Sequence, residues 1–364
     1  MKILYILPTL DHVAPIEVMS GIILRGEAKD ISVIALHKSG KNSLKAKLRE
    51  HNIEVHEYAS FKEALLNFGS LLEKAKEHDI IHAGGFVPIL YARLMKLFLP
   101  KVRFVMTVHS NEPQELASRG YSGIKLAKNR FRLWLSKRFL YKSFDVCVGV
   151  SHAVQSYLKS CGCKKSVTIH NGIDYPPKIT PQVPKEALVF VQVGHIERLK
   201  NQLFTLHLAS FLSTDYQGAK FIFCGAIKDK EYYEELHAFI KAHHLQSSVE
   251  FRGLLAKDEL FHVLAKSRFF IMPSQSEGLP LSLLEALYFE TVPLCARVGG
   301  MVDVIEKTKS GLLFDLSDEE ALVKIEHFIK NAPPRLEVGE ILENEFSAEA
   351  MAKEYHGLYR EIFS

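Results

Sequence analysis

Two glutamates in one apolar stretch are the residues of this chain whose spacing most suggests chemistry. They are Glu277 and Glu285, in the segment SEGLPLSLLEAL at residues 276–287. If the stretch were helical throughout, the two Cα atoms would lie roughly 12 Å apart along the axis. That separation is too large for both carboxylates to act on one atom, but it suits the two ends of an extended ligand. The alternative is an N-terminal acid followed by a solvent-facing helical glutamate.

Polar residues and glycines also follow several predicted strands directly. His109 follows the apolar run 103–108, Gly225 follows 220–224, and Glu277 comes soon after 268–274. The segment VGHIERLKNQ at 193–202 adds a glycine and basic side chains after a further strand, at Gly194, His195, Arg198 and Lys200. A glycine lets the backbone approach a ligand closely, and Arg and Lys supply charge for phosphate. The alternative for this segment is a solvated start of a helix.

The loop between the two glutamates offers a second anion-binding element. Gly278 and Pro280 indicate a turn into a helix, because proline is tolerated in a first helical turn. Free N–H groups at a helix N-terminus attract anions. We therefore expect a diphosphate between the Arg198 and Lys200 side chains and the backbone of Gly278, Leu279, Pro280 and Leu281.

The elements that must position these residues alternate between strands and helices. Apolar runs at 2–7, 30–36, 79–84, 103–109 and 145–150 predict strands, and helical patterns at 18–26, 61–78, 87–98 and 151–160 lie between them. The alternation restarts at 187 and continues to a last helix at about 347–364. Such alternation predicts parallel sheets with helices on both faces, so the fold class is α/β with two doubly wound, Rossmann-like domains.

The domain boundary is predicted at a proline-rich segment. Residues 174–187 hold four of the 14 prolines and little periodicity, which indicates a linker over 175–187. We expect an N-terminal domain at 1–174, on which the last helix packs back, and a C-terminal domain at 188–346. Ligands of such sheets bind at the carboxyl ends of the strands, so we expect the site in the cleft between the domains.

Composition excludes several classes of protein. The 364 residues are 47% hydrophobic and 24% charged, with a net charge of +4, which is typical of a soluble two-domain protein. The longest apolar runs are too short to span a bilayer, and the opening MKILYILPTL lacks the features of a signal peptide. The five cysteines are scattered, which favours free thiols in the cytoplasm. No metal site is expected, because Cys161 and Cys163 have no second pair at zinc spacing.

These motifs together resemble a known enzyme family. Glu277 and Glu285 resemble the E-x7-E motif of retaining GT-B glycosyltransferases of family 4, the "glycosyl transferases group 1". VGHIERLKNQ resembles the family's donor loop, IHNGID at 169–174 the end of its N-terminal domain, and VSHAVQSYL at 150–158 the helix before it. The TVH ending at His109, the KDEL at 257–260 and the VGG at 298–300 also fit.

The resemblance implies roles for individual residues. Glu277 would contact the donor sugar, Glu285 the ribose, and the 278–281 backbone the phosphates. Arg198 and Lys200 would neutralise the departing nucleoside diphosphate, an electrostatic effect worth a few kcal/mol for each well-placed group. His109 would contact the sugar or the oxocarbenium-like centre. Because the protein supplies the cations, no metal or other cofactor is required.

Three departures from the family pattern bear on activity. His195 stands where the family usually has Arg, Glu290 stands where it has a glycine, and the loop 8–21 has Ala14-Pro15 where a Gly-Gly is usual. We assign the acceptor side to the residues of that loop, Asp11, His12, Ala14 and Pro15. The departures at His195 and Ala14-Pro15 support a rival hypothesis, a catalytically weak homologue that binds glycans or partners, whereas Glu290 affects only the helix exit. A phosphorylase-like enzyme would need a pyridoxal lysine, for which we find no candidate.

The predicted function is therefore transfer of a hexose or N-acetylhexosamine, with retention, from a nucleotide sugar to a glycan or lipid-linked acceptor. A UDP-sugar is the expected donor, although the sequence does not specify the base. A role in cell-surface polysaccharide or glycolipid synthesis rests on analogy with the family alone.

A basic stretch predicts a membrane-facing surface. Residues 119–142 carry eight Lys or Arg, no acid and the only tryptophan. A basic amphipathic helix with an aromatic residue is typical of binding to an anionic membrane, here the inner face of the cytoplasmic membrane. The alternative is a packed helix with a solvated cationic face, and nucleic acid is not an expected partner. The expected membrane-facing residues are Lys128, Arg130, Arg132, Trp134, Lys137 and Arg138.

Overall fold

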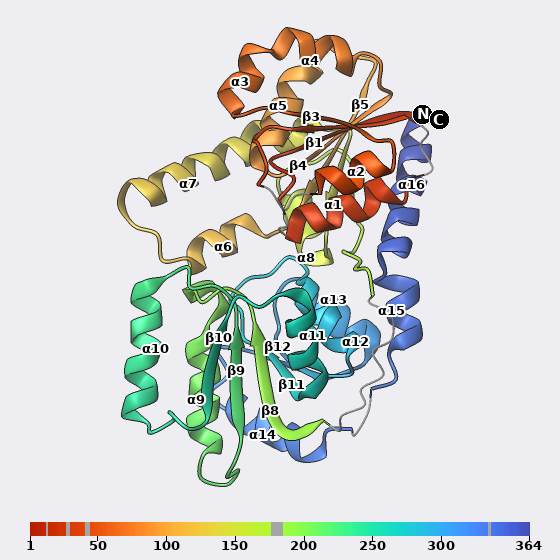
Figure 1. The fold of residues 1–364 in the computed structure, drawn as a ribbon. Helices are drawn as coiled ribbons and strands as arrows, with labels where there is room; N and C mark the ends of the chain where they lie inside the picture. Colours follow the sequence, from red (N-terminus) through yellow and green to blue (C-terminus); the bar gives the residue numbers. More distant parts are fainter. Residues whose placement is uncertain (12–13, 27–29, 41–43, 176–184, 334–335) are drawn as a thin grey trace. The chain divides into compact units, whose positions relative to one another are not determined.

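The computed structural model describes residues 1–11, 14–26, 30–40, 44–175, 185–333 and 336–364. Two compact units divide the chain (Figure 1). Unit 1 comprises Met1–Ser110, Lys128–Asp174 and Glu345–Ser364, and unit 2 comprises Asn111–Ala127 and Tyr175–Asn344. The predicted N-terminal domain at 1–174 differs from unit 1 at the segment 111–127, which the structure assigns to unit 2. Most of the predicted linker, residues 176–184, lies outside the described residues.

Unit 1 is built on a parallel sheet in the order β3-β2-β1-β4-β5-β6-β7. Its strands are β1 (Lys2–Leu7), β2 (Asp30–Ala35), β3 (Glu54–Glu57), β4 (Ile80–Gly84), β5 (Arg103–Val108), β6 (Val146–Gly149) and β7 (Ser166–Thr168). The central strands are buried because helices pack on the sheet, as their continuous apolar sequences predict. Its helices are α1 (Ala14–Leu24), α2 (Lys45–Glu50), α3 (Phe61–Leu66), α4 (Phe68–Ala75), α5 (Phe86–Lys96), α8 (His152–Ser160) and α16 (Ala348–Phe363).

Unit 2 repeats the plan with the strand order β10-β9-β8-β11-β12-β13. Its strands are β8 (Glu186–Val193), β9 (Lys220–Cys224), β10 (Val249–Gly253), β11 (Ser267–Met272), β12 (Val292–Ala296) and β13 (Leu312–Phe314). Its helices include α6 (Glu112–Ser118), α9 (Gln202–Leu212), α10 (Lys230–Ala242), α11 (Lys257–Lys266), α12 (Leu281–Tyr288), α13 (Gly300–Thr308) and α14 (Ala321–Asn331). Two further helices run across the unit boundaries, α7 (Gly123–Leu135) and α15 (Gly339–Glu345).

Every strand pairing that the structure describes is parallel, so the predicted α/β class is confirmed. Three short strands were not predicted, β3, β7 and β13, because none of them carries a run of buried apolar residues. The predicted helix 61–78 is interrupted at Asn67, which leaves α3 and α4. None of the helices in the described part of the chain combines the length and apolar character needed to cross a bilayer.

The last helix is tied into unit 1 by a buried polar network. Nδ1 of His82 lies 2.6 Å from the hydroxyl of Tyr359, and Nε2 of His82 lies 2.8 Å from the hydroxyl of Thr107. Thr107 in turn lies 2.9 Å from the hydroxyl of Tyr355, and Tyr5 donates to Tyr359 at 3.2 Å. Because Tyr355 and Tyr359 belong to α16, this network joins the helix to β1, β4 and β5. Its member on β5, Thr107, lies two residues before His109 in the sequence.

Candidate active site

The two motif glutamates occupy different kinds of backbone. Glu277 lies in the loop after β11, and Pro280 is the N-cap residue of α12, so only Glu285 is helical. The separation calculated for a continuous helix therefore does not apply. Both side chains are largely buried, with exposed fractions of 10% for Glu277 and 12% for Glu285. The alternative of a solvent-facing helical glutamate is wrong.

Each glutamate has a lysine beside it. Nζ of Lys200 lies 2.6 Å from Oε1 of Glu277, and Nζ of Lys257 lies 3.6 Å from Oε1 of Glu285. Lys200 ends a short 3₁₀ turn, and Asn201 then takes a left-handed conformation, with φ of 51°, which turns the chain into α9. The amide of Gln192 donates to the carbonyl of Lys200 at 2.7 Å, which fixes the turn to β8. The ammonium of Lys200 is thus held next to the first motif carboxylate.

Glycines let the loops of the site touch backbone to backbone. Gly299, with φ of 55°, lies so close to the carbonyl of Glu277 that a Cβ would overlap it. The N–H of Gly300 donates to the carbonyl of Gly278 at 2.5 Å, which fixes the start of the 278–281 segment. Gly225 lies equally close to the carbonyl of Gly194, where a Cβ would also overlap. Backbone geometry alone therefore requires glycine at several of these positions.

The structure does not bring Arg198 to the motif glutamates. Its guanidinium lies 2.8 Å from Glu235 and 3.9 Å from Asp229, and it stacks 5.1 Å from the ring centre of Tyr232. These partners lie on α10 or at its start. Arg198 instead lines a cavity together with His195. Burial, together with the charge of Lys228, lowers the pKa of His195, so this imidazole is neutral at pH 7.

His109 lies in unit 1, at the end of β5 beside Gly84. Its Nε2 atom is buried and has no hydrogen-bond partner among the described residues. Burial lowers the pKa of His109 to about 4, so the ring is neutral at physiological pH. A neutral, unpartnered imidazole nitrogen can donate to or accept from a sugar hydroxyl, whereas a cation there would repel a developing positive centre.

The predicted acceptor-side residues are only partly described. Asp11 accepts hydrogen bonds from the hydroxyl of Thr9 at 2.8 Å and from the N–H of Gly40 at 2.6 Å. Ala14 and Pro15 form the first turn of α1, and His12 lies outside the described residues. Pro15 thus sits where its missing N–H costs no helical hydrogen bond.

Comparison with known proteins agrees with this arrangement. Residues 178–344 match the family model "Glycosyl transferases group 1", and residues 26–175 match "Glycosyltransferase Family 4". The chain belongs to glycosyltransferase family 4. It is therefore an enzyme of the glycosyltransferase class with the GT-B fold, as the motifs predicted.

Individual relatives of this family 4 glycosyltransferase are distant. The sulfoquinovosyl transferase SQD2 of Arabidopsis thaliana is 27% identical over 73% of the chain, which spans only 53% of that protein. The O-antigen biosynthesis glycosyltransferase WclY of Escherichia coli is 24% identical over 87% of the chain and 89% of its own length. Among solved structures, Anabaena Alr3699/HepE in complex with UDP superposes with a TM-score of 0.76 at 17% identity, covering 99% of this chain and 100% of that one.

Several residues near the candidate site of the glycosyltransferase were not predicted as site residues from the sequence. Lys257 accompanies Glu285, and its only signal was the KDEL segment that it begins. Gly299 and Gly300 belong to the VGG segment, which resembled the family but carried no predicted role. The His82 network had no signal, because its members are far apart in the sequence.

The basic stretch of the glycosyltransferase exposes aromatic rings. Phe131, Trp134 and Phe139 are 60%, 53% and 49% exposed. Phe131 stacks on Trp134 at 5.7 Å, and Phe139 meets Trp134 edge-on at 5.5 Å. We call these three residues the aromatic patch. Four of the predicted basic residues are exposed around it, namely Lys128, Arg130, Lys137 and Arg138.

Arg132 differs from these residues, since its guanidinium lies 4.3 Å from the ring centre of Phe86 in α5. It is only partly exposed and packs against unit 1.

Proposed function

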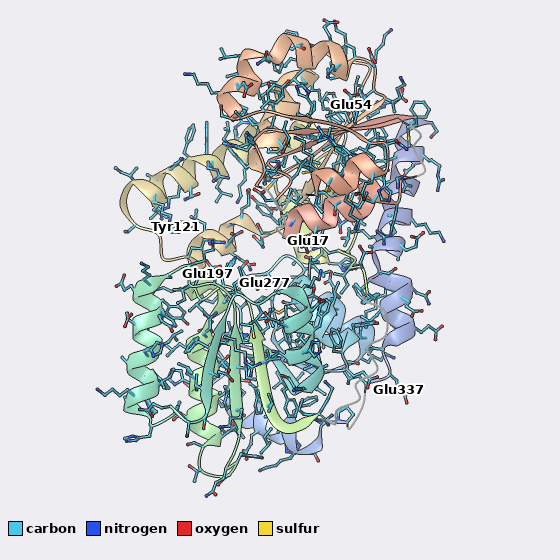
Figure 2. All side chains as sticks on the ribbon, viewed as in Figure 1. Glu17, Glu54, Tyr121, Glu197, Glu277 and Glu337 are labelled. Atoms are coloured by element: carbon cyan, nitrogen blue, oxygen red, sulfur yellow. The ribbon has the colours of Figure 1, made fainter. Side chains whose placement is uncertain are left out.

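We propose that the protein is a retaining glycosyltransferase that moves a hexose or N-acetylhexosamine from a UDP-sugar to a glycan or lipid-linked acceptor. The observation that carries the proposal is the contact of Lys200 with Glu277. Glu277 lies at the carboxyl end of the second sheet (Figure 2). One anionic and one cationic group so close together match a ligand with sugar hydroxyls next to a diphosphate.

In this proposal each group of unit 2 has one task. Glu277 accepts hydrogen bonds from sugar hydroxyls, and Glu285 accepts them from the ribose. Lys200 and the 278–281 backbone stabilise the charge that grows on the diphosphate as the bond to the anomeric carbon breaks. The acceptor hydroxyl then forms the new glycosidic bond and passes its proton to the departing diphosphate oxygen. His109 would contact the donor sugar as a neutral imidazole.

The relatives support the substrate class. The Anabaena HepE structures are described as complexes with UDP, with UDP and glucose, and with UDP-glucose. WclY is named for O-antigen biosynthesis, and SQD2 for transfer of sulfoquinovose. We therefore propose a UDP-sugar as the donor and a surface polysaccharide or glycolipid as the product, without a catalytic metal.

We also propose that the protein binds the inner face of the cytoplasmic membrane through the aromatic patch and the basic residues around it. The support is the exposure of three aromatic rings, each in contact with at least one of the others, together with the exposure of Lys128, Arg130, Lys137 and Arg138. Aromatic rings at the headgroup level and cations facing anionic lipid are a common combination for peripheral binding.

The donor site is tested by thermal shift with UDP, GDP and ADP. A nucleotide at a hundred times its Kd stabilises the native state by about 2.7 kcal/mol. We expect a shift with UDP that is lost in Glu285→Ala and kept in Glu306→Ala, an exposed glutamate of α13 in the same unit. No shift with any nucleotide would contradict the proposal.

Activity separates the enzyme from a weak homologue. UDP-sugar hydrolysis or transfer by the wild type should disappear in Glu277→Gln and persist in EDTA. Nucleotide binding without turnover in the wild type would favour the binding-subunit hypothesis, and loss of turnover in EDTA would refute the metal-free mechanism.

A further inference from the structure

A large cavity of unit 2 has no role in the donor chemistry proposed above. It has a volume of about 760 Å³ and opens beside His195. We call it the cationic pocket, because five Lys or Arg side chains line it against two acids. Lys200, Glu277 and Glu285 are not among the described residues that line it. Its basic residues are Arg119, Lys125, Arg198, Lys228 and Lys230.

Part of the cationic pocket is lined by two loops at the ends of β8 and β9 that are hydrogen-bonded to each other. The N–H of Ile196 donates to the carbonyl of Ala226 at 3.0 Å, and the carbonyl of Ile196 accepts from the N–H groups of Lys228 and Asp229 at 3.1 Å each. Gly194 and Gly225 are in backbone contact at the same place. Lys228 is therefore held by its backbone next to the donor loop.

Residues between α6 and α7, which belong to unit 2, also line the cationic pocket. Figure 2 labels one of them, Tyr121. Arg119 lies 2.7 Å from Glu115 and 2.9 Å from Glu197, so this pair ties the segment to the donor loop. Gly120, with φ of 62°, turns the chain next to the stem of Arg198. Nζ of Lys125 lies 3.9 Å from the ring centre of Tyr121, so this ring holds the ammonium group by a cation–π contact.

The acids of the cationic pocket are already engaged. Glu197 faces Arg119, while Asp229 caps α10 by accepting from the N–H of Tyr232 at 3.0 Å. Lys228 and Lys230 are exposed and have no acidic partner among the residues that the structure describes. Positive charge in a concave, partly walled space attracts anions strongly, because the walls exclude water.

We propose that the cationic pocket binds a phosphate or diphosphate group carried by the acceptor. The inference rests on the proposed glycosyl transfer, since it names the class of acceptor for that reaction. A cavity of this size exceeds what a diphosphate needs, so it also has room for the group attached to it. Its position beside the donor loop, apart from Glu277 and Glu285, favours the acceptor over the donor.

The test measures binding of inorganic pyrophosphate to the full-length protein with saturating UDP present, so that the donor site is occupied. We compare the wild type with Lys228→Ala/Lys230→Ala and with Lys241→Ala, an exposed lysine near the end of α10 and outside the pocket. Loss of two charge-assisted contacts should weaken binding about tenfold or more in the double variant, and not in Lys241→Ala. The UDP-induced thermal shift reports that each variant is folded.

A second part of the experiment, binding of farnesyl diphosphate, distinguishes soluble acceptors from lipid-linked ones. Farnesyl diphosphate that binds more tightly than pyrophosphate, and loses affinity in the double variant, indicates a lipid-linked diphosphate. Equal affinities indicate a soluble phosphorylated acceptor.

Two results would overturn the inference while leaving the donor proposal intact. One is that UDP binds but neither anion binds alongside it. The other is that both anions bind equally well to the wild type and the double variant. Failure of UDP itself to bind would instead contradict the proposed function.

Discussion

Lys200 and Glu277 are an ion pair whose members, in the proposed mechanism, gain other partners when a donor binds. Both are largely buried, with exposed fractions of 18% and 10%, and their charged atoms are 2.6 Å apart. Removing one partner of such a pair leaves the other charge buried and uncompensated. The pair therefore keeps an ammonium and a carboxylate in place before the ligand arrives, which is the preorganisation that transition-state stabilisation requires.

Lys200→Met should lower kcat/KM for the donor by about 10²–10³, because one well-placed cation contributes a few kcal/mol to transition-state stabilisation. Methionine keeps the length of the stem that packs near Gly194. Steady-state kinetics with the UDP-sugar measures the effect, with Lys241→Ala as the control. A kcat/KM within threefold of the wild type would contradict the role of Lys200.

His82 predicts how stability depends on pH. It is fully buried, and burial is the main cause that lowers its pKa to about 3. In the unfolded chain histidine has a pKa near 6.5, so between pH 6.5 and 3 the unfolded chain binds a proton at this residue whereas the folded protein keeps the ring neutral. Stability from this group is therefore complete above pH 6.5 and is lost as the pH falls from 6.5 toward 3.

Urea unfolding at a series of pH values should reveal this loss as up to a few kcal/mol in the wild type and much less in His82→Gln. The exposed His51→Gln variant is the matched control and should follow the wild type. If all three proteins lost stability in parallel as the pH falls, the loss would come from protonation of carboxylates and not of His82.

At the scale of elements, the helices carry much of what distinguishes this chain. α7 and the turn that follows it expose the aromatic patch, whereas α10 and the loop before it direct cations into the cationic pocket. α12 buries Leu283, Leu284 and Leu287, and in doing so fixes the direction of Glu285. A helix can thus serve binding through one exposed face while packing through another.

The aromatic patch is tested with vesicles that contain phosphatidylglycerol. Trp134 is the only tryptophan, so its fluorescence should shift to the blue on binding and fall off with added salt. Phe131→Ser/Phe139→Ser should weaken vesicle binding about tenfold or more, because two apolar rings no longer enter the interface.

The control for the aromatic patch is Phe211→Ser, a 40% exposed ring on α9 of unit 2. Equal binding of all these proteins, or no fluorescence shift in the wild type, would contradict the membrane proposal.

At the scale of the whole molecule, unit 1 depends on the end of the chain. α16 contributes the buried residues Met351, Tyr355, Leu358 and Tyr359, and Ser347 pairs with Ile173 in a β-bridge. Burying each large apolar side chain stabilises a fold by about 1.5–3 kcal/mol. Their sum is comparable to the total stability of a typical domain.

A chain that ends at residue 346 should therefore fail to fold unit 1, while unit 2 keeps its UDP-induced stabilisation. Limited proteolysis with and without UDP measures this, since fragments of unit 2 should survive and those of unit 1 should not. Protection of both units in the truncated chain would show that α16 is dispensable.

The sequence by itself determined the fold class and the main candidate residues. Alternating apolar strands and amphipathic helices leave few arrangements other than two parallel sheets, and the E-x7-E spacing and the glycine-basic loop are local patterns. Edge strands such as β3 were not predicted, because exposed or half-exposed residues such as Glu54 and His56 carry little periodic signal.

Only the tertiary structure decided which charges meet. Lys200 and Arg198 are two residues apart, yet one reaches Glu277 and the other reaches Glu235. The assignment of segment 111–127 to unit 2, the partner of Glu285 and the His82 network are likewise contacts between residues distant in the chain. Such contacts depend on the three-dimensional course of loops, and a one-dimensional pattern records residue types and spacing but not where a side chain points.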